Sequence, residues 1–395
     1  MSIKKRVNQI CCKIRSASFA VAYWDGDRVH YGSGAEEFVI HLDSEAAVKG
    51  LFSNLKLRLA EAYMDGAIDI EGDLERFVRL VFLLKSDDLE LGALGRAALS
   101  TLALRQRNSR DQAKKNIQHH YDLGNDFYRL WLGAGMVYSC AYFHRPDDGL
   151  DQAQQQKLRH LCAKLRLQPG HRVLDVGCGW GQLLLYAAKE YGVQGVGVTV
   201  SEEQVDEARM RIAERELGHR VAVSLRDYRD IPLDRPFDRI ISVGMFEHVG
   251  REFIDTYFQH TSRLLRKGGC GVLHTMGRMR VAPTSEWLRK YIFPGMYFPS
   301  LDEIATSMGQ HDLTIVDIEN MRLHYALTID RWIEEFERNS QQIQHMFDER
   351  FIRMWRLYLH SAKASFKYGD LQVWQITYTK GLDNEWPLQR NYLYE

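Results

Sequence analysis

The stretch that most constrains the fold is residues 173–181, Val-Leu-Asp-Val-Gly-Cys-Gly-Trp-Gly. An apolar strand that stops in a glycine-rich turn and continues as a helix predicts a ligand-binding strand–turn–helix unit. Its glycines allow the backbone to approach a ligand where a Cβ atom would collide. The helix that follows offers unpaired N–H groups to an anionic group. A tight strand–helix corner without a ligand is the alternative.

The turn lacks the Gly-Lys-Ser/Thr ending of a phosphate loop. Its spacing, Asp-x-Gly-x-Gly-x-Gly, resembles the first motif of class I S-adenosylmethionine (SAM) methyltransferases. From residue 119 onward, strands and helices alternate, which predicts an α/β fold with a largely parallel, Rossmann-like sheet of seven strands. The expected strands are residues 172–176, 195–200, 221–225, 237–243, 270–274, 313–318 and 373–379, with two amphipathic helices between the last two.

Residues 1–88 are expected to form a smaller α+β domain. Asp25-Gly26 predicts a hairpin, and Ser44 is a candidate N-cap for a helix that extends to about residue 52. Alternation within residues 60–72 predicts a short half-buried strand. Residues 74–84 predict a helix with an apolar stripe, which either packs in the core or binds lipid. The stripe comprises Leu74, Phe77, Val78, Val81 and Phe82.

Residues 89–118 are expected to be a helical linker with an apolar side followed by a basic run, and residues 119–395 the catalytic domain. Such a linker lies against anionic headgroups or presents a solvated face. The formal net charge of +0 gives no global attraction for nucleic acid. We expect a peripheral or soluble chain, because no apolar run approaches the ~20 residues that span a bilayer.

The 6 cysteines form no Cys-x-x-Cys pair, which favours reduced thiols in a cytosol. No group of potential ligands has convincing spacing for a metal site. The residues that follow the expected strands are of a different kind. Ligands of such sheets bind where the strands end, and the chain places polar groups there: Asp175, Thr199 and Ser201, Asp227-Tyr228, Glu247-His248 and His274.

Together these residues resemble the cyclopropane-fatty-acyl-phospholipid synthase family, which includes the mycolic acid cyclopropane synthases. The resemblance covers residues 116–380 and is carried by several segments. These are residues 120–128 (His-Tyr-Asp-Leu-Gly-Asn-Asp-Phe-Tyr), 138–143 (Tyr-Ser-Cys-Ala-Tyr-Phe), 197–201 with Gln204, 227–229, 247–250, 273–275, 291–295, and His324-Tyr325 with Trp332. Residues 63–66 and 69–72 also resemble the N-terminal module of the bacterial phospholipid enzymes, which the shorter mycolic acid enzymes lack.

The resemblance implies transfer of a methylene from SAM across a cis double bond of an unsaturated phospholipid acyl chain. It implies a bound bicarbonate as the base that removes a proton from the transferred methyl. The implied catalytic residues are Cys140, Glu247, His274 and Tyr325, and the same four bind bicarbonate together with the backbone of Met276. A carboxylate 4 Å from bicarbonate would be repelled by roughly 4 kcal/mol at an effective dielectric constant of 20. We therefore expect a shared proton or hydrogen bond between Glu247 and the anion.

The resemblance also implies the SAM contacts. Tyr138 and Ser139 are expected at the methionine portion, Thr199 and Gln204 at the ribose, and Asp227 and Tyr228 near the adenine. Phe246 is expected to close the reactive end. The full set of implied cofactor residues is Tyr138, Ser139, Asp175, Gly177, Gly179, Thr199, Ser201, Gln204, Asp227, Tyr228 and Phe246.

Each residue also has an ordinary structural alternative. Cys140 is otherwise a buried thiol, His274 a core histidine, and Glu247 a helix cap. Gln204 completes a capping box, and Tyr325 is a packing aromatic. Two positions depart from the family: Met276 stands where isoleucine is usual, and residues 293–299 lack a second glycine after Gly295.

The alternative function is SAM-dependent C-methylation that gives methyl- or methylene-branched acyl chains. An inactive SAM- and lipid-binding protein and a nucleic-acid methyltransferase are further alternatives. The first predicts decay of the base residues, and the second requires a basic cleft. The family resemblance implies a homodimer, peripheral contact with a phospholipid bilayer, and a cytoplasmic location at the inner membrane face.

Overall fold

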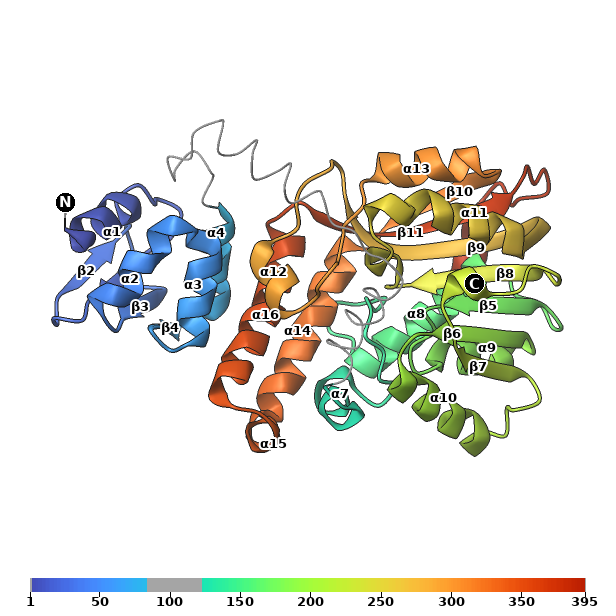
Figure 1. Ribbon diagram of the computed structural model, residues 1–395, viewed down its shortest axis with the longest axis horizontal. Helices are drawn as coiled ribbons and strands as arrows, with labels where there is room; N and C mark the ends of the chain where they lie inside the picture. Colours follow the sequence, from blue (N-terminus) through green and yellow to red (C-terminus); the bar gives the residue numbers. More distant parts are fainter. Residues whose placement is uncertain (1, 84–122, 395) are drawn as a thin grey trace.

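The computed structural model describes residues 2–83 and 123–394. The expected basic linker, residues 89–118, lies outside the described residues. The chain forms a four-stranded sheet near its N-terminus and a seven-stranded sheet further on. Helices stand between the two sheets (Figure 1).

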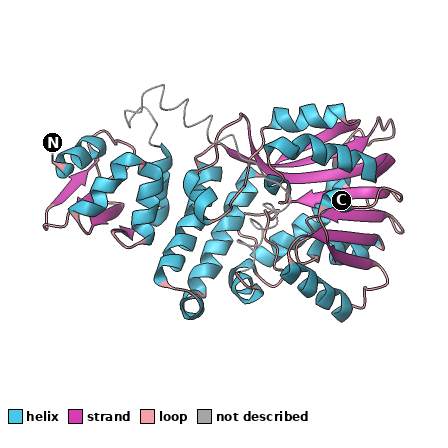
Figure 2. Cartoon of the chain, in the orientation of Figure 1, coloured by secondary structure: helices cyan, strands magenta, loops and turns pink. Residues whose placement is uncertain are grey.

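The large sheet has the order β10-β11-β9-β8-β5-β6-β7. β11 runs in the opposite direction to the other six strands of this sheet, which are parallel to one another. The expected largely parallel α/β fold is therefore confirmed (Figure 2). β9 begins earlier and ends later than the sequence pattern predicts. The strands are β5 (Arg172–Val176), β6 (Gln194–Thr199), β7 (Val221–Leu225), β8 (Phe237–Val243), β9 (Leu265–Arg278), β10 (Leu313–Asn320) and β11 (Leu371–Lys380).

Helices cover both faces of this sheet. Because successive side chains of a strand point to opposite faces, Val173 packs in one core and Leu174 in the other. One core holds α8 (Leu150–Lys164), α9 (Gln182–Tyr191) and α10 (Glu202–Glu214) against the sheet. The opposite core holds α11 (Ile254–Leu264) and α13 (Leu301–Gln310). These two layers fix the strand ends from both sides.

A third group of helices lies between the two sheets. Between β10 and β11 the chain forms three helices rather than the two expected: α14 (Arg322–Arg338), α15 (Ser340–Met346) and α16 (Glu349–Lys367). The short α15 was missed because Asn339 and Phe347 interrupt the pattern on either side of it. α14 and α16 stand side by side (Figure 1), with α7 (Asn125–Leu132) and α12 (Glu286–Tyr291) beside them.

The N-terminal module, residues 2–83, has a sheet of order β2-β1-β3-β4. β1 (Phe19–Ala22) and β2 (Arg28–Tyr31) form the expected hairpin, and β3 (Phe38–Leu42) the expected strand. Gly26 in the turn has φ +89°, which a side chain disfavours. Ser44 caps α2 (Glu45–Lys49) as expected, by accepting a hydrogen bond from the Ala47 backbone. α1 (Ile3–Cys11) precedes the sheet.

The strand expected within residues 60–72 is partly wrong. Residues 60–64 are the end of α3 (Leu55–Met64), and only β4 (Ile68–Gly72) is extended. A few alternating residues also fit one helical turn, and packing of α3 against α12 and α16 decides between the two. α4 (Leu74–Leu83) is the expected apolar helix.

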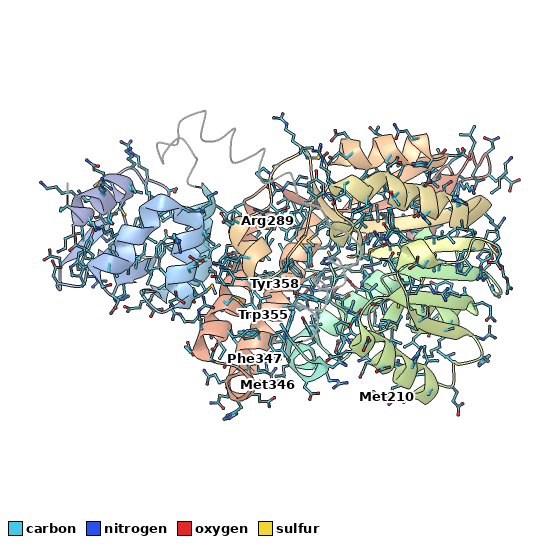
Figure 3. All side chains as sticks on the ribbon, viewed as in Figure 1. Met210, Arg289, Met346, Phe347, Trp355 and Tyr358 are labelled. Atoms are coloured by element: carbon cyan, nitrogen blue, oxygen red, sulfur yellow. The ribbon has the colours of Figure 1, made fainter. Side chains whose placement is uncertain are left out.

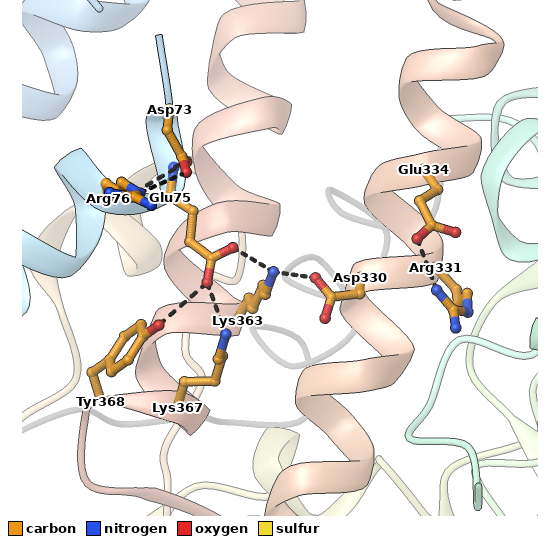
Figure 4. Close-up of polar contacts among 9 residues, drawn as sticks. All are labelled: Asp73, Glu75, Arg76, Asp330, Arg331, Glu334, Lys363, Lys367 and Tyr368. Carbon is orange, nitrogen blue, oxygen red and sulfur yellow. Dashed lines mark hydrogen bonds and ion pairs between the residues drawn. The ribbon is translucent and has the colours of Figure 1, made fainter. Parts of the chain in front are cut away.

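The module packs against α16 through a polar cluster (Figure 4). The Lys363 ammonium on α16 contacts Glu75 on α4 and Asp330 on α14. Lys367 lies 3.0 Å from the other oxygen of Glu75. One continuous hydrophobic core joins the module to α14 and α16, with Phe77 and Tyr358 among its members. Within residues 2–83 and 123–394, no helix is long and apolar enough to cross a bilayer.

Candidate active site

A pocket of about 160 Å³ lies where β5, β6, β7 and β8 end. Gly177, directly after β5, has φ +82°, and a Cβ atom there would lie 2.5 Å from the Met245 side chain. Only glycine therefore fits this turn, as the sequence predicts. We call this space the strand-end pocket. The expected cofactor residues among its lining are Tyr138, Ser139, Asp175, Gly177, Gly179, Thr199, Gln204, Asp227 and Tyr228.

Two expected cofactor residues do not line this pocket. Ser201 is fully buried as the N-cap of α10, where its hydroxyl accepts a hydrogen bond from the Gln204 backbone. Phe246 packs into the sheet core against Tyr257 and Phe258. Both residues follow strand ends, but their side chains point away from the pocket. Of the two hydrogen bonds of the expected capping box, only the one from the Gln204 backbone to the Ser201 hydroxyl forms. The Gln204 side chain instead accepts a hydrogen bond from the Thr199 hydroxyl at 2.6 Å.

Lys157 on α8 is a pocket residue that the sequence did not single out. Its Nζ donates to the Ser139 hydroxyl at 3.0 Å, and its side chain is only 2% exposed. Burial lowers the pKa of Lys157 to about 8, and burial raises the pKa of Asp175 to about 7 although Lys157 opposes that shift. Asp175 Oδ1 is buried without a hydrogen-bond partner within the described chain. The sequence signal that could have identified Lys157 is its place beside Leu158 and Leu161, on the face of an amphipathic helix that is buried.

A second space, the large cavity, has a volume of about 860 Å³. Its walls come from the ends of β8 and β9, from α12, α14 and α16, and from α3 and α4 of the N-terminal module. Every residue that the resemblance assigned to bicarbonate lines this cavity: Cys140, Glu247, His274, Met276 and Tyr325. Residues about 185 positions apart in the sequence, from Cys140 to Tyr325, therefore share one chamber.

Glu247 is the central ionisable group of the large cavity. Its Oε1 accepts the Met276 backbone N–H at 2.6 Å, while Oε2 is buried with no hydrogen-bond partner among the described residues. Burial raises the pKa of Glu247 to about 7, against the opposing effect of the Met276 hydrogen bond. A buried acceptor of this kind is satisfied when a ligand supplies an O–H or N–H group. The Met276 amide hydrogen itself is already taken by Glu247.

His274 and Cys140 are both held in their neutral forms. Burial, with help from the Lys157 charge, lowers the pKa of His274 well below its usual value. The Gln375 side-chain amide donates to His274 Nδ1 at 3.2 Å, so the proton lies on Nε2. Burial raises the pKa of the Cys140 thiol, which donates to the Ala141 carbonyl at 3.2 Å. A protonated thiol is a poor nucleophile.

Aromatic rings form much of the wall near these groups. Tyr325 is 8% exposed and packs edge-on against Trp332, with ring centroids 5.7 Å apart. The Tyr138 and Tyr358 hydroxyls are 2.8 Å apart. Figure 3 labels Tyr358 on α16 in the middle of the molecule. These rings offer π faces to a cation that develops in the cavity.

The two spaces adjoin. Tyr138, Ser139, Gly244 and His248 line both the strand-end pocket and the large cavity. A small pocket at the end of a glycine-rich turn, with Lys157 and Asp175 in its wall, thus shares residues with a large chamber that contains buried Glu247 and His274. Such a pair can hold a nucleotide-like methyl donor on one side and an apolar acceptor on the other.

The sheet order, the glycine turn and the strand-end pocket define a class I SAM-dependent methyltransferase. Residues 108–376 match the family described as mycolic acid cyclopropane synthetase, and residues 7–90 match a domain family of unknown function. The chain belongs to the mycolic acid cyclopropane synthetase family, and the expected family and enzyme class are confirmed.

Individual relatives agree with this assignment. The chain is 37% identical over 364 residues to a probable fatty acid methyltransferase of Pseudomonas putida, covering 90% of each chain. It is 40% identical to the cyclopropane-fatty-acyl-phospholipid synthase of Escherichia coli K12, over 83% of this chain and 84% of that one. A crystal structure of mycolic acid cyclopropane synthase CmaA1 with SAH and CTAB aligns at 34% identity and a TM-score of 0.64. That alignment covers 68% of this chain and 98% of the other.

Proposed function

We propose that this enzyme transfers a methylene from SAM across a cis double bond of an unsaturated phospholipid acyl chain, which yields a cyclopropane fatty acid. The observation that carries the proposal is the shared wall between the strand-end pocket and the large cavity. The E. coli and P. putida relatives, whose names refer to fatty acyl substrates, support it.

In this reaction the methyl–sulfur bond of SAM breaks and two carbon–carbon bonds form. One proton leaves the transferred methyl. The residues of the strand-end pocket hold SAM. Tyr138, Ser139, Gly244 and His248 line both spaces, which supports methyl transfer at the boundary between them. An alkene is a weak nucleophile, so alignment of the two reactants and exclusion of water supply much of the rate. Tyr138 and Tyr325 stabilise the carbocation on the acyl chain by cation–π contact, worth about 2 kcal/mol when desolvated.

Bicarbonate, when bound, would supply the base. The proposed ligand set is Cys140, Glu247, His274, Met276 and Tyr325, in which the Met276 N–H would have to exchange Glu247 Oε1 for the anion. Its fit is supported by the partnerless Oε2 of Glu247, which can accept an O–H, and by the Nε2–H of His274, which can donate to an anion. A Glu247 pKa near 7 suits a group that takes up and releases a proton at neutral pH. Neutral Cys140 would act as an S–H donor rather than a nucleophile, and its proton would have to leave the Ala141 carbonyl for the anion.

C-methylation to a branched product is the second candidate, favoured by the fatty acid methyltransferase name of the P. putida relative. Both candidates share the methyl transfer and differ in the proton that is lost. We further propose action as a homodimer at the inner face of the cytoplasmic membrane. The apolar large cavity supports contact with a bilayer, and co-sedimentation with vesicles and ultracentrifugation would test contact and assembly.

The test is incubation with SAM carrying a trideuterated methyl group and vesicles of a cis-unsaturated phospholipid, followed by mass spectrometry and proton NMR of the acyl chains. A cyclopropane ring keeps two deuterium atoms and shows no alkene signal. A methyl branch formed by loss of a proton from the acyl chain keeps three deuterium atoms and one alkene, and a methylene branch keeps two deuterium atoms on a new terminal alkene. Absence of any labelled acyl product would reject both candidates.

A further inference from the structure

The large cavity carries two cations at the boundary between the N-terminal module and the rest of the chain. Lys56 lies on α3 and Arg289 on α12, and both line the cavity. We propose that Lys56 and Arg289 bind the phosphate group of the phospholipid substrate, so that the two domains together recognise the headgroup. The inference rests on the proposed function and extends it to a specific anion site.

Local contacts hold together the two helices that carry these cations. The Asn54 side-chain amide donates to Glu286 Oε2 at 2.9 Å, which ties the start of α3 to the start of α12. Lys56 is the second residue of α3, and Arg289 lies one helical turn beyond Glu286 on the same face of α12. A second contact between the same helices runs from Trp287 Nε1 to Met64 Sδ at 3.1 Å. Figure 3 labels Arg289 on α12, where the module meets the helical layer.

Neither cation has a carboxylate partner among the described residues. Within residues 2–83 and 123–394, no carboxylate pairs with Lys56 or with the Arg289 guanidinium, and Arg289 Nε is buried without a hydrogen-bond partner. A buried guanidinium nitrogen without an acceptor is costly unless a ligand supplies one. Glu286 is the nearby carboxylate among the lining residues, and Asn54 already donates to it.

Other cations of the same region behave differently. Lys290, next to Arg289 in sequence, lies 2.7 Å from Glu61, and Arg58 lies 2.8 Å from the same carboxylate. Arg278, which also lines the cavity, lies 3.6 Å from Asp370. Among the described residues, these neighbouring cations each have a carboxylate within 4 Å, whereas Lys56 and Arg289 have none, although Arg278 Nε, like Arg289 Nε, is buried without a hydrogen-bond partner. Arginine presents a planar fork that matches a phosphate, and lysine adds a point charge.

The test compares the whole enzyme with its Arg289→Gln and Lys56→Gln variants on two substrates in the same nonionic micelles. One is dioleoyl phosphatidylglycerol and the other is dioleoylglycerol, which has the same acyl chains and no phosphate. We expect each variant to raise the KM for the phospholipid about tenfold, the loss typical of a charged hydrogen bond. The KM for dioleoylglycerol and the KM for SAM should stay unchanged. Arg289→Lys, which keeps the charge, should recover part of the loss.

Lys189→Gln is the matched control, because it removes one positive charge from an exposed side chain of α9, outside both spaces. It should leave both KM values unchanged. Added inorganic phosphate, at constant ionic strength, distinguishes a site for any phosphate from one that needs a lipid. If inorganic phosphate inhibits the wild type but not Arg289→Gln, the site accepts any phosphate. If phosphate does not inhibit and Arg289→Gln still raises the KM for the phospholipid, the site needs a lipid phosphate.

Equal losses on both substrates, or no loss on the phospholipid, would overturn the phosphate site while leaving the proposed reaction intact. A wild-type enzyme that alkylates neither lipid would instead reject the proposed function. The two failures are therefore separable within one set of assays.

Discussion

The strand-end pocket and the large cavity are built in different ways. The pocket draws its lining from residues 136–249, mostly from turns that follow consecutive strands. The large cavity joins α3 and α4 near the N-terminus to α12, α14 and α16. Local sequence determines the first, whereas packing between distant segments determines the second. The cofactor site can therefore stay constant while the acceptor site changes.

The two spaces also treat charge differently. The strand-end pocket holds Lys157 close enough to Asp175 to oppose the rise of its pKa. In the large cavity, burial pushes Glu247, His274 and Cys140 toward their neutral forms: it raises the pKa of Glu247 and of Cys140 and lowers the pKa of His274. The part of the cavity around these three neutral groups accepts an apolar chain at lower cost than a region with unpaired ions would. Substitutions should therefore affect the two spaces separately.

The largest effect is expected for Glu247→Gln. The amide still fills the space and can accept the Met276 N–H, but its NH2 group cannot accept a proton at the position of Oε2. We expect kcat to fall by about a thousandfold, within the range of lost acid–base catalysis. Labelled-methyl incorporation measures the rate.

The dissociation constant for SAM should change less than twofold in this variant, because Glu247 lines only the large cavity. Calorimetric titration of SAM provides this control. A rate equal to that of the wild type would remove Glu247 from the base site, and a parallel loss of SAM binding would show that the two spaces are not separable.

The next effect concerns the module that closes the large cavity. Lys363→Met leaves Glu75 and Asp330 facing each other without the ammonium between them (Figure 4). Because the Lys363 side chain is only 9% exposed, we expect a loss of about 3 kcal/mol in the free energy of unfolding. Lys367→Met is the matched control, since this lysine is 36% exposed and should cost less than about 1 kcal/mol. Urea unfolding measures both, and equal losses would contradict a specific role for Lys363.

The difference between local sequence and packing of distant segments also explains which features the sequence predicted. The strands of the large sheet and the Gly177 turn follow from local apolar runs and glycine spacing, and the structure has them. The sequence allows the stripe on α4 to be core or lipid face. Phe77 is 4% exposed and belongs to the core, yet it also lines the large cavity, as does Phe82, which is 37% exposed. A periodicity argument cannot separate these roles, because both require the same apolar side chains.

The sequence analysis identified the functional residues of the large cavity through the family resemblance and not through local sequence patterns. Cys140 and Tyr325 have no local signal that joins them, since only the packing of α14 places both in one chamber. Lys157 was missed because a lysine on a helix is usually solvated, and here the helix buries it beside Ser139. Ser201 was expected at the cofactor because it follows a strand, and Phe246 because the family resemblance implies it. Neither lines the pocket, because position in the sequence does not determine side-chain direction.

Lys157→Met is the sharpest test of the strand-end pocket. The change removes the donor to Ser139 and the charge near Asp175. We expect the dissociation constant for SAM to rise about ten- to a hundredfold, as for loss of a charged hydrogen bond. Lys164→Met is the control: this lysine is also buried on α8, pairs with Glu319, and does not line the pocket. Equal losses of SAM affinity in both variants would indicate a general loss of α8 packing instead.

The pH dependence should report the large cavity. If ionised Glu247 is the active form, the rate falls about fivefold from pH 7 to pH 6, because its pKa is about 7 and its ionised fraction drops from about one half to about one tenth. The folded-state pKa lies above the unfolded value of about 4.3, so the native protein binds the extra proton between those values. Its free energy of unfolding therefore falls as pH rises from about 4.3 to about 7. In Glu247→Gln this dependence should weaken, and an identical pH slope in both proteins would assign the slope to another group.

The smallest expected effect distinguishes the helix-capping residue Ser201 from the cofactor-pocket residue Thr199. Ser201 caps α10 away from the pocket, so Ser201→Ala should cost about 1 kcal/mol in the free energy of unfolding and leave the SAM dissociation constant unchanged. Thr199, two positions earlier, lines the pocket and donates to Gln204, so Thr199→Val should raise that constant several-fold. Thermal melts and SAM titrations of the two variants decide between the roles. Weakened SAM binding in Ser201→Ala would return this residue to the cofactor site, because a cap acts on the helix and not on the ligand.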